Sequence, residues 1–356
     1  MNADAFRAVF RPTRFTARAG LATLLLITVA VPTGAVSRAA APAVAKPDLV
    51  WPLPPETPRI RYLESLTGDS TFRKQSRLKR LLLGPVTDPG ITLLKPYGVA
   101  TDHAGRVYVS DTGLGAVVVF DRSARQVRLL GNGGRAHLAT PMGIAIDELG
   151  RLFVADAGLN QVLCLDGGGE VLLALGREQG MENPAGIAID RNRHRLYVAD
   201  SHLHQILVYG TDGVFQSRWG SRGPGLGEFN FPTNLALDEA GTLYIVDTGN
   251  FRVQILSPDG SPLSAFGRAG DGPGQFHRPK GIALDSAGHV YVADAAFNNF
   301  QIFDREGRLL LDVGSTGRDP GTFWLPAGMH IDGKNELFVV DQINRRVQIF
   351  RYIVPR

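Results

Sequence analysis

The chain has 356 residues, with 38 Lys and Arg residues, 34 Asp and Glu residues and a single cysteine, Cys164. Residues 1–45 hold five of the basic residues and one aspartate, and subtracting these from the totals leaves 33 residues of each sign. A remainder without net charge lacks the electrostatic footprint of nucleic-acid binding, so we expect no nucleic-acid partner. One cysteine excludes an intramolecular disulfide, and its apolar QVLCLD surroundings predict a small buried side chain.

The first 45 residues predict a targeting segment. Arginines precede an apolar run from Leu21 to Val31, and small residues follow it, which is the pattern of a secretory signal. The run is short for a membrane span. We therefore expect an exported protein, periplasmic or extracellular. An uncleaved N-terminal anchor that keeps the protein at a membrane is the alternative. Residues 46–58 are rich in proline and predict an extended tether.

Two different segments follow the tether. The sequence RIRYLESLTG, residues 59–68, alternates apolar and polar side chains and ends on glycine, so it predicts a β-strand. Residues 69–95 form an insert with five basic residues in its first half, and they predict one short basic helix that begins near Ser70. That helix either contacts anionic lipid or a partner, or packs over one end of the fold through Phe72, Leu78 and Leu81.

Residues 96–356 contain six copies of one pattern. The copies open KPYGVATD, TPMGIAID, NPAGIAID, FPTNLALD, RPKGIALD and LPAGMHID, and successive prolines are 43 to 48 residues apart. Within a copy, short runs of alternating Val, Ile, Tyr and Phe are bounded by Gly, Asp and Pro, which predicts four antiparallel strands. A period of this length with several strands per copy is typical of propeller blades.

The sixth copy ends before its fourth strand, and residues 59–68 match the missing strand. Pairing the two chain ends in this way closes the ring and covers the exposed strand edges. The predicted fold is therefore an all-β, six-bladed propeller of four-stranded antiparallel blades over residues 59–356, with the last blade closed by an N-terminal strand.

The repeats resemble a known family. The segments from Gly249 to Ile255 (GNFRVQI) and from Asn344 to Phe350 (NRRVQIF) are similar to the NHL repeat, and the resemblance extends over all six copies. The lead-in VWPLPPETPRIRYL also looks like that of exported bacterial NHL proteins. The resemblance implies a propeller, whereas it leaves function open. NHL propellers include RNA-binding modules, extracytoplasmic sensor domains and a zinc-dependent amidating lyase, and related propellers include streptogramin lyases and sugar lactonases.

Two aspartates recur in every copy, at the end of the first strand and at the end of the second. Aspartate at a strand end accepts backbone N–H bonds and fixes the next turn, so we interpret both sets as structural. Departures from the repeat are more informative. Inner strands need small residues because the blades converge, yet Asn234 replaces the glycine of one copy and His330 replaces the alanine of another.

The loops after the second aspartate also vary between copies, as binding loops do. Together with His330 they supply ten ligand-binding candidates, which are His202, His204, Asn250, Arg252, Asn298, Asn299, His330, Asn344, Arg345 and Arg346. Arg252 and Arg346 have a second interpretation, as partners of neighbouring aspartates.

Two functions compete on these observations. The first is a binding or interaction scaffold that presents its loop face to a protein or small ligand, with no catalytic residue, metal ligand or cofactor, in a protein expected to be a monomer. The second is a metal-assisted lyase or lactonase working at the mouth of the central channel, around His202, His204 and His330. The binding interpretation is favoured because the similar amidating lyase holds its zinc through histidines from different blades, whereas His202 and His204 belong to one blade.

Overall fold

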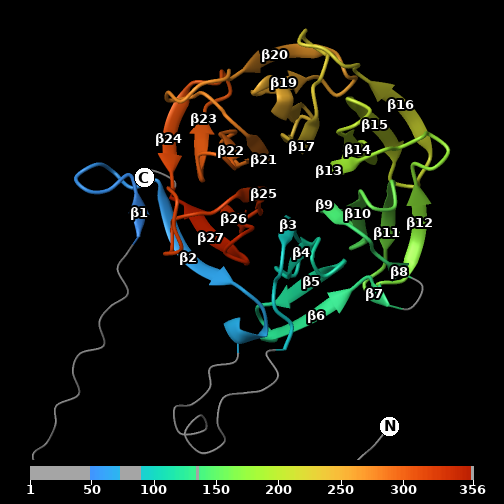
Figure 1. The fold of residues 1–356 in the computed structure, drawn as a ribbon, viewed down its shortest axis with the longest axis horizontal. Helices are drawn as coiled ribbons and strands as arrows, with labels where there is room; N and C mark the ends of the chain where they lie inside the picture. The colour runs from blue at the N-terminus through green and yellow to red at the C-terminus, as the bar shows by residue number, and fades with distance from the viewer. Residues whose placement is uncertain (1–48, 73–89, 134–135, 354–356) are drawn as a thin grey trace, which may run out of the picture. The chain divides into compact units, whose positions relative to one another are not determined.

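The computed structural model describes residues 49–72, 90–133 and 136–353. These residues form antiparallel sheets arranged in a ring around a central axis (Figure 1), so the predicted all-β, six-bladed propeller is confirmed. Within the described ranges, helical structure is limited to two single turns, η1 (Asp69–Thr71) and η2 (Thr248–Asn250). No described segment makes a helix with the length and apolarity that a bilayer crossing requires.

The first three blades each contain four strands in sequence order, from the axis outwards. Blade 1 consists of β3 (Pro96–Thr101), β4 (Val107–Asp111), β5 (Ala116–Asp121) and β6 (Gln126–Leu130). A small hairpin, β7 (Asn132–Gly133) and β8 (Ala136–His137), leads to blade 2. Blade 2 consists of β9 (Pro141–Ile146), β10 (Leu152–Asp156), β11 (Gln161–Leu165) and β12 (Val171–Leu175). Blade 3 consists of β13 (Pro184–Asp190), β14 (Arg195–Asp200), β15 (Gln205–Gly210) and β16 (Phe215–Trp219).

The last three blades complete the ring. Blade 4 consists of β17 (Pro232–Leu237), β18 (Leu243–Asp247), β19 (Arg252–Leu256) and β20 (Pro262–Phe266). Blade 5 consists of β21 (Pro279–Leu284), β22 (Val290–Asp294), β23 (Asn299–Phe303) and β24 (Leu309–Val313). Blade 6 takes β25 (Pro326–Ile331), β26 (Glu336–Asp341) and β27 (Arg346–Tyr352) from the C-terminal part of the chain, and β2 (Ile60–Leu66) and β1 (Val50–Trp51) from the N-terminal part.

The ring closes between the two ends of the chain, as the sequence predicted. Strand β2 pairs antiparallel with β27 from Ile60 opposite Tyr352 to Leu66 opposite Val347. Strand β1, from the segment expected to be a tether, adds a further short pairing to β2. Aromatic packing reinforces this junction, because the Trp51 ring lies edge-on to the Phe350 ring at 5.9 Å between centroids.

The hydrophobic core is divided among the gaps between neighbouring blades. Alternating apolar residues of the middle strands face the next blade, as Val107 and Val109 of blade 1 do toward Val340 and Val347 of blade 6. This arrangement explains why the strands are rich in Val and Ile, which pack well on pleated surfaces. Cys164 is fully buried in one of these cores, as its apolar surroundings predicted.

The inner strands converge closely enough to require small residues. A Cβ atom added to Gly143 would lie 2.7 Å from the carbonyl oxygen of Ala185 on the next blade, and one added to Gly98 would lie 2.6 Å from the carbonyl oxygen of Met142. Real Cβ atoms do not approach oxygen so closely, so the recurring glycine has a packing cause. The sequence-based expectation of small inner residues is therefore confirmed.

Part of the N-terminal region and most of the insert lie outside the described residues. This applies to the predicted targeting segment, and to residues 73–89 of the predicted basic helix, including Leu78 and Leu81. At the start of the insert, Ser70 belongs to η1 and the Phe72 ring packs edge-on against Phe120 at 6.5 Å. The described start of the insert is thus attached to blade 1.

Deleting residues 46–68 removes β1 and β2 and leaves the outer edge of β27 unpaired. We expect aggregation and loss of cooperative thermal unfolding, because an exposed strand edge pairs with other chains. Calorimetry with light scattering measures both effects, and a truncation that removes only residues 1–45 is the matched control. An unchanged melting curve for the longer deletion would contradict closure by β2.

Candidate functional site

Strand direction gives the propeller two different faces. Each inner strand begins at the repeated proline and ends at the first aspartate of the copy, and the second strand returns, so that Pro96 pairs with Asp111 and Pro326 pairs with Asp341. We call the face with the prolines and the loops between second and third strands the loop face. The opposite face, with the hairpins between first and second strands, is the turn face. The two sets of recurrent aspartates therefore lie at opposite faces.

Both sets of aspartates hold backbone in place. On the loop face, the Asp111 carboxylate accepts hydrogen bonds from the backbone N–H groups of Leu94 and Lys95 at 2.7 and 2.9 Å. On the turn face, the Asp147 carboxylate accepts the backbone N–H of Arg151 at 2.8 Å and pairs with its guanidinium at 2.6 Å. The structural interpretation of the recurrent aspartates is confirmed.

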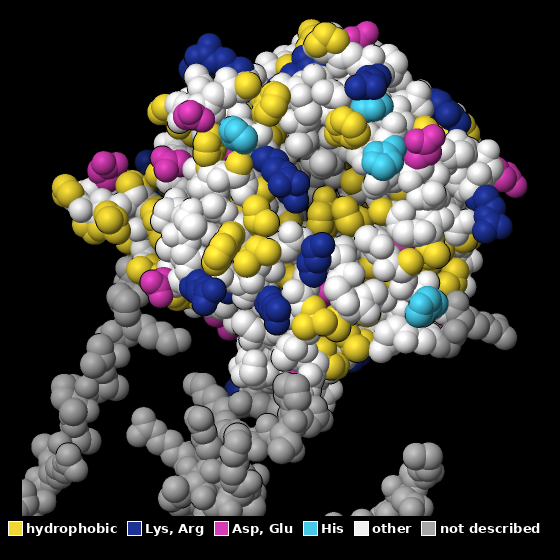
Figure 2. Space-filling view, viewed as in Figure 1, with side chains coloured by type: hydrophobic (Ala, Val, Ile, Leu, Met, Phe, Trp, Pro, Cys, Tyr) yellow, Lys and Arg dark blue, Asp and Glu magenta, His cyan; other side chains and the backbone are white. Residues whose placement is uncertain are grey.

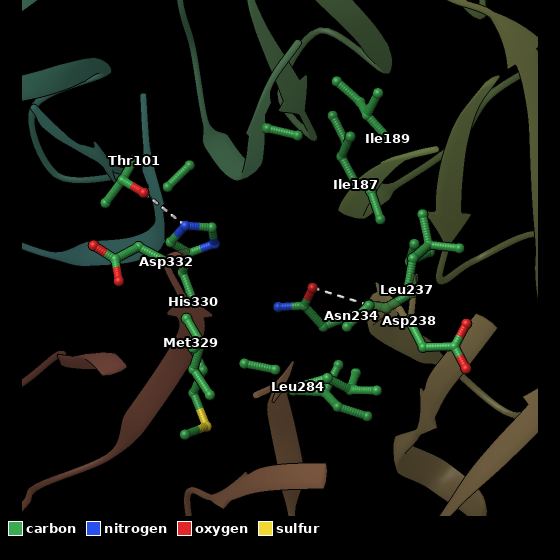
Figure 3. A pocket seen from close by; sticks show the side chains of 18 of the residues that line it. Thr101, Ile187, Ile189, Asn234, Leu237, Asp238, Leu284, Met329, His330 and Asp332 are labelled. Atoms are coloured by element: carbon green, nitrogen blue, oxygen red, sulfur yellow. Dashed lines mark hydrogen bonds between the residues drawn. The ribbon is translucent and has the colours of Figure 1, made fainter. Parts of the chain in front are cut away.

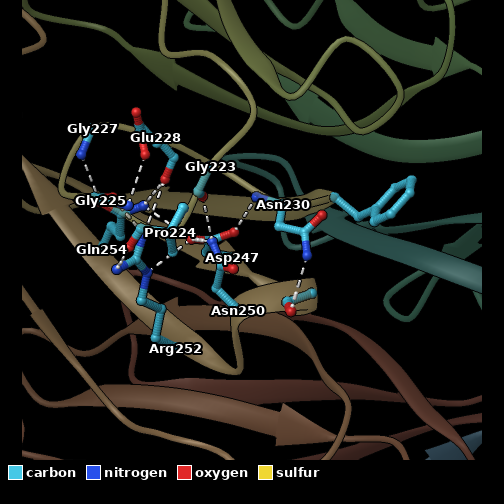
Figure 4. A network of polar contacts seen from close by, with 12 residues as sticks. Gly223, Pro224, Gly225, Gly227, Glu228, Asn230, Asp247, Asn250, Arg252 and Gln254 are labelled. Atoms are coloured by element: carbon cyan, nitrogen blue, oxygen red, sulfur yellow. Dashed lines mark hydrogen bonds and ion pairs between the residues drawn. The ribbon is translucent and has the colours of Figure 1, made fainter.

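Four of the ten candidate side chains, two in blade 4 and two in blade 6, form ion pairs or hydrogen bonds with neighbouring loop residues. In blade 4, Arg252 pairs with Asp247 at 2.9 Å and donates to the carbonyl oxygens of Pro224 and Gly225, each at 2.7 Å (Figure 4). Asn250 donates to the carbonyl oxygen of Gly223 and to the Asp247 carboxylate. These bonds fix the loop that leads into the inner strand.

Blade 6 repeats the network of blade 4. Arg346 pairs with Asp341 at 2.7 Å and donates to three backbone carbonyl oxygens, those of Arg318, Asp319 and Thr322. Asn344 donates to the Gly317 carbonyl oxygen at 2.8 Å. The second interpretation of Arg252 and Arg346, as partners of neighbouring aspartates, is therefore confirmed. Two residues that were not predicted from the sequence, Gln254 and Gln348, complete these networks through hydrogen bonds to Asp247 and Asp341.

The candidates of blades 3 and 5 have equivalent roles. The Nδ1 atom of His204 accepts the backbone N–H of Phe231 at 3.0 Å, and Oδ1 of Asn298 accepts that of Leu325 at 2.8 Å. Both bonds anchor the residue before a repeated proline. Burial is the main cause that lowers the pKa of His204, followed by the charge of Arg222. Asn299 begins strand β23, and its buried side-chain oxygen has no hydrogen-bond partner in the described structure.

His202 and Arg345 remain exposed on the loop face. The Nε2 atom of His202 lies 3.2 Å from the amide nitrogen of Asn183, and Arg345 makes no ion pair within the described structure. Of the loop candidates, these two present their side chains most openly to solvent.

A cavity of about 940 Å³ runs along the axis, from the level of the inner glycines to the turn face. Its walls combine aliphatic residues such as Ile187, Leu237 and Leu284, contributed by different inner strands, with polar and charged residues such as Asp238 and Asp332 (Figure 3). Six inner strands with small residues cannot fill the axis, so a cavity follows from the fold. A concave cavity that places polar groups among apolar walls can hold a small molecule.

The two departures from the inner-strand pattern both line this cavity. The Nε2 atom of His330 lies 2.8 Å from the hydroxyl oxygen of Thr101, and the Asn234 side chain points into the cavity from blade 4 (Figure 3). Burial, together with the charge of Arg191, lowers the pKa of His330 to about 4. The ring, although partly open to the cavity, is therefore neutral at pH 7.

The structure does not bring together the three histidines of the enzyme alternative. His330 is near the end of β25 and pairs with Phe338, at the turn-face end of the axis, whereas His202 and His204 belong to a loop of the opposite face. Within the described residues, no group of three His, Cys, Asp or Glu side chains is placed to hold a metal ion. The expectation of one shared mouth was wrong because it ignored strand direction.

The loop face has two features that the sequence analysis overlooked. Exposed apolar side chains gather there, and they belong to Leu94, Leu159, Phe231, Trp324 and Ile343. Basic side chains lie around the loop-face end of the axis, and they belong to Lys95, Arg278 and Lys280. The face drawn in Figure 2 shows Lys and Arg side chains and apolar side chains around a central hollow. One signal in the sequence was Lys280, which follows a repeated proline where the other copies have Tyr, Met, Ala or Thr.

Comparisons with known proteins agree with the fold. Residues 187–253 match a family model described as a 6-bladed beta-propeller, and residues 276–303 match the NHL repeat. These matches support the resemblance drawn from the repeats. No curated protein sequence matches the chain significantly.

Several solved structures share the architecture at low sequence identity. Virginiamycin B lyase from Staphylococcus aureus is 11% identical with a TM-score of 0.56, covering 82% of this chain and 99% of that one. A gluconolactonase from Xanthomonas campestris is 19% identical with a TM-score of 0.57, covering 73% and 87%. An auxiliary nutrient binding protein from Bacteroides thetaiotaomicron is 14% identical with a TM-score of 0.55, covering 73% and 69%. At these identities the likeness establishes the fold alone.

Replacing Arg346 by Ala removes the cation that pairs with the buried Asp341 carboxylate, together with a donor to each of three carbonyl oxygens. We expect a loss of about 3 kcal/mol in the free energy of unfolding, because removing one member of a buried ion pair leaves an uncompensated charge. Urea denaturation measures the change. Arg345→Ala, which removes an exposed neighbour, is the control and should change stability by less than about 0.5 kcal/mol. Equal midpoints for the two variants would contradict the structural role.

His330 makes stability depend on pH in a defined window. Its pKa is about 4 in the folded protein and about 6.5 in an unfolded chain, so the unfolded state binds the proton first and stability falls as the pH drops from about 6.5 toward 4. His330→Gln removes this component. Melting temperatures of both proteins from pH 7.5 to 4.5 should therefore show a steeper acid loss for the natural chain, and parallel curves would contradict the lowered pKa.

Proposed function

We propose that this chain, a six-bladed propeller of the NHL-repeat family, is a binding module that presents its loop face to an acidic polypeptide. The observation that carries the proposal is the joint exposure of apolar and basic side chains on that face. Trp324 is 40% exposed and Phe231 is 43% exposed, while Lys95 and Arg278 are exposed without a carboxylate partner among the described residues.

The distribution of these side chains suits an extended partner. Leu94 lies before blade 1, Leu159 belongs to blade 2, and Ile343 belongs to blade 6, so apolar anchors are spread around the axis. Aromatic and arginine side chains are the residues that contribute most to protein interfaces. Unpaired positive charges favour a partner with negative ones, because complementary potentials steer association and select partners.

The loops that carry these side chains are held in place before any partner arrives. The networks around Asp247 and Asp341 fix the segments that lead into blades 4 and 6. Little conformational entropy remains to be lost from such loops when a partner binds. Four candidates thus serve binding by supporting the surface, and they are Arg252, Arg346, Asn250 and Asn344. Two others, His202 and Arg345, are available to touch the partner.

The proposal includes the expectations from the sequence that concern the whole protein. It describes an exported, monomeric protein without a cofactor, acting outside the cytoplasm or at a membrane through its N-terminal segment. It assigns no nucleic-acid partner, because residues 46–356 have equal numbers of basic and acidic residues. The N-terminal segment that supports export lies outside the described residues.

A second candidate is binding or turnover of a small molecule in the axial cavity. His330 and Asn234 favour it, because they are the two polar departures from the inner-strand pattern and both line that cavity. The similar folds of a lyase and a gluconolactonase are compatible with it. For the metal-assisted form, elemental analysis is decisive. A stoichiometric transition metal that is lost in His330→Ala would rank this candidate above the binding module.

Peptide selection tests the proposed function. We expect a displayed random library, selected on the immobilised protein, to yield peptides that combine Asp or Glu with aromatic or aliphatic residues. Their affinity, measured by fluorescence anisotropy, should fall about tenfold in Trp324→Ser and in Ile343→Ser, as for anchors at an interface. Leu149→Ser is the matched control, because Leu149 is 73% exposed on the turn face. Peptides that bind all variants equally, or no enrichment at all, would overturn the proposal.

A further inference from the structure

Lys280 spans the loop-face end of the axis. It follows the repeated proline of blade 5, and its Nζ atom lies 5.7 Å from the ring centroid of Tyr97, the equivalent residue of blade 1. Blade 6 stands between these blades and has Ala327 at this position. The small alanine side chain occupies little of the space that the long lysine side chain crosses, so the ammonium group approaches the far blade over the mouth of the channel.

Two further cations accompany Lys280. Lys95 directly precedes the proline of blade 1, and Arg278 directly precedes the proline of blade 5. Burial lowers the pKa of Lys280 to about 8, and the positive charges of Arg278 and Lys95 lower it further in the same direction. Among the described residues no carboxylate forms an ion pair with any of the three. Like charges held together without a counter-ion repel one another.

The recurrent aspartates nearest to these cations do not supply that counter-ion. Asp111 and Asp294 follow the second strands of blades 1 and 5, and both carboxylates are fully buried. They accept the backbone N–H groups of Lys95 and Arg278, at 2.9 and 3.1 Å respectively. These carboxylates therefore fix the main chain of the two basic residues, whose side chains make no ion pair with them.

We propose that Lys280, Arg278 and Lys95 form a binding seat for an oxyanion, a carboxylate or a phosphate group, at the loop-face mouth of the channel. The Arg278 guanidinium offers a planar pair of donors that matches such a group, and each lysine adds a compact positive charge. The Tyr97 ring forms an apolar side of the seat. An anion placed there would relieve the repulsion among the three cations.

The seat deepens the proposed function and in one respect rests on it. In the bound polypeptide, the group in the seat is an Asp or Glu side chain or the terminal carboxylate. A free small anion has the same chemistry, so it can occupy the seat without any polypeptide. This makes the seat testable with simple salts.

Titration calorimetry with citrate and with inorganic phosphate, at low ionic strength and pH 7, measures the seat directly in the full chain. We expect both anions to bind the natural protein, and binding to weaken at least tenfold in Lys280→Met, Arg278→Gln and Lys95→Gln. Arg278 and Lys95 are exposed, so their variants should fold even if Lys280→Met is destabilised. The matched control Lys334→Gln removes one exposed charge on the turn face and should bind as the natural protein does.

A second readout separates a seat from a general charge effect. Binding of an anion should raise the pKa of Lys280, observed by NMR of the lysine side chains, without moving the side-chain signals of Lys334. The proposal would be overturned if the three seat variants bound the anions as tightly as the natural protein, or if Lys334→Gln lost as much affinity as they do.

The outcomes for the seat and for the proposed function can be told apart. Citrate binding that depends on Lys280, without any selected peptide, supports the seat and contradicts the polypeptide partner. A second outcome is that the selected peptides lose affinity in Trp324→Ser but keep it in Lys280→Met, and that citrate does not bind. This result supports the polypeptide partner and contradicts the seat. Peptides that lose affinity when their acidic residues are changed to amides, and that citrate displaces, support both.

Discussion

The antiparallel pairing of β2 with β27 is the contact on which the rest of the propeller depends. No blade has a core of its own, because the apolar faces of its middle strands are buried only against its neighbours. Without β2, the edge of β27 and part of the junction between blades 6 and 1 would be exposed. Closure also fixes how near the inner strands approach one another, and the recurring glycines set that distance. The axial cavity and both of its mouths are consequences of this closed geometry.

The same polar networks that make the loops regular also decide which side chains are free to act. Each recurrent loop-face aspartate binds backbone N–H groups of the preceding segment, and blades 4 and 6 add Arg, Asn and Gln to the network. A polar side chain that recurs at such a position already uses its hydrogen bonds to stabilise its own loop. Function is therefore expected at positions where copies differ, such as Asn234, Lys280 and His330, since the fold alone does not explain these residues.

The architecture could be predicted from the sequence because most of its signals are local. Prolines set the period of the repeat, and apolar and polar side chains alternate within each strand. The fourth strand that the last copy lacks could be recognised near the other end of the chain. The pairing of Arg346 with Asp341 was also within reach, as both belong to one hairpin. The basic seat was not, because Lys95 and Lys280 are distant in sequence and meet only across a closed ring. Phe231 and Trp324 were overlooked because an apolar residue one or two positions before a repeated proline looks like core. His330 was placed at the wrong mouth because residue type carries no information on strand direction.

Net charge describes this chain poorly, because charge is distributed unequally between the two ends of the axis. At the turn face, Asp102, Asp147 and Asp190 are each paired with an arginine close in sequence, so their charges cancel locally. At the loop face, the corresponding aspartates are buried and bind main chain, which leaves the cations around the mouth without such partners. Among the described residues, a chain with balanced charge therefore presents a group of three cations at the loop-face mouth. Because the field of such a cluster is short-ranged at physiological salt, the proposed seat would favour a single anionic group near the axis over a polyanion that must contact a whole face.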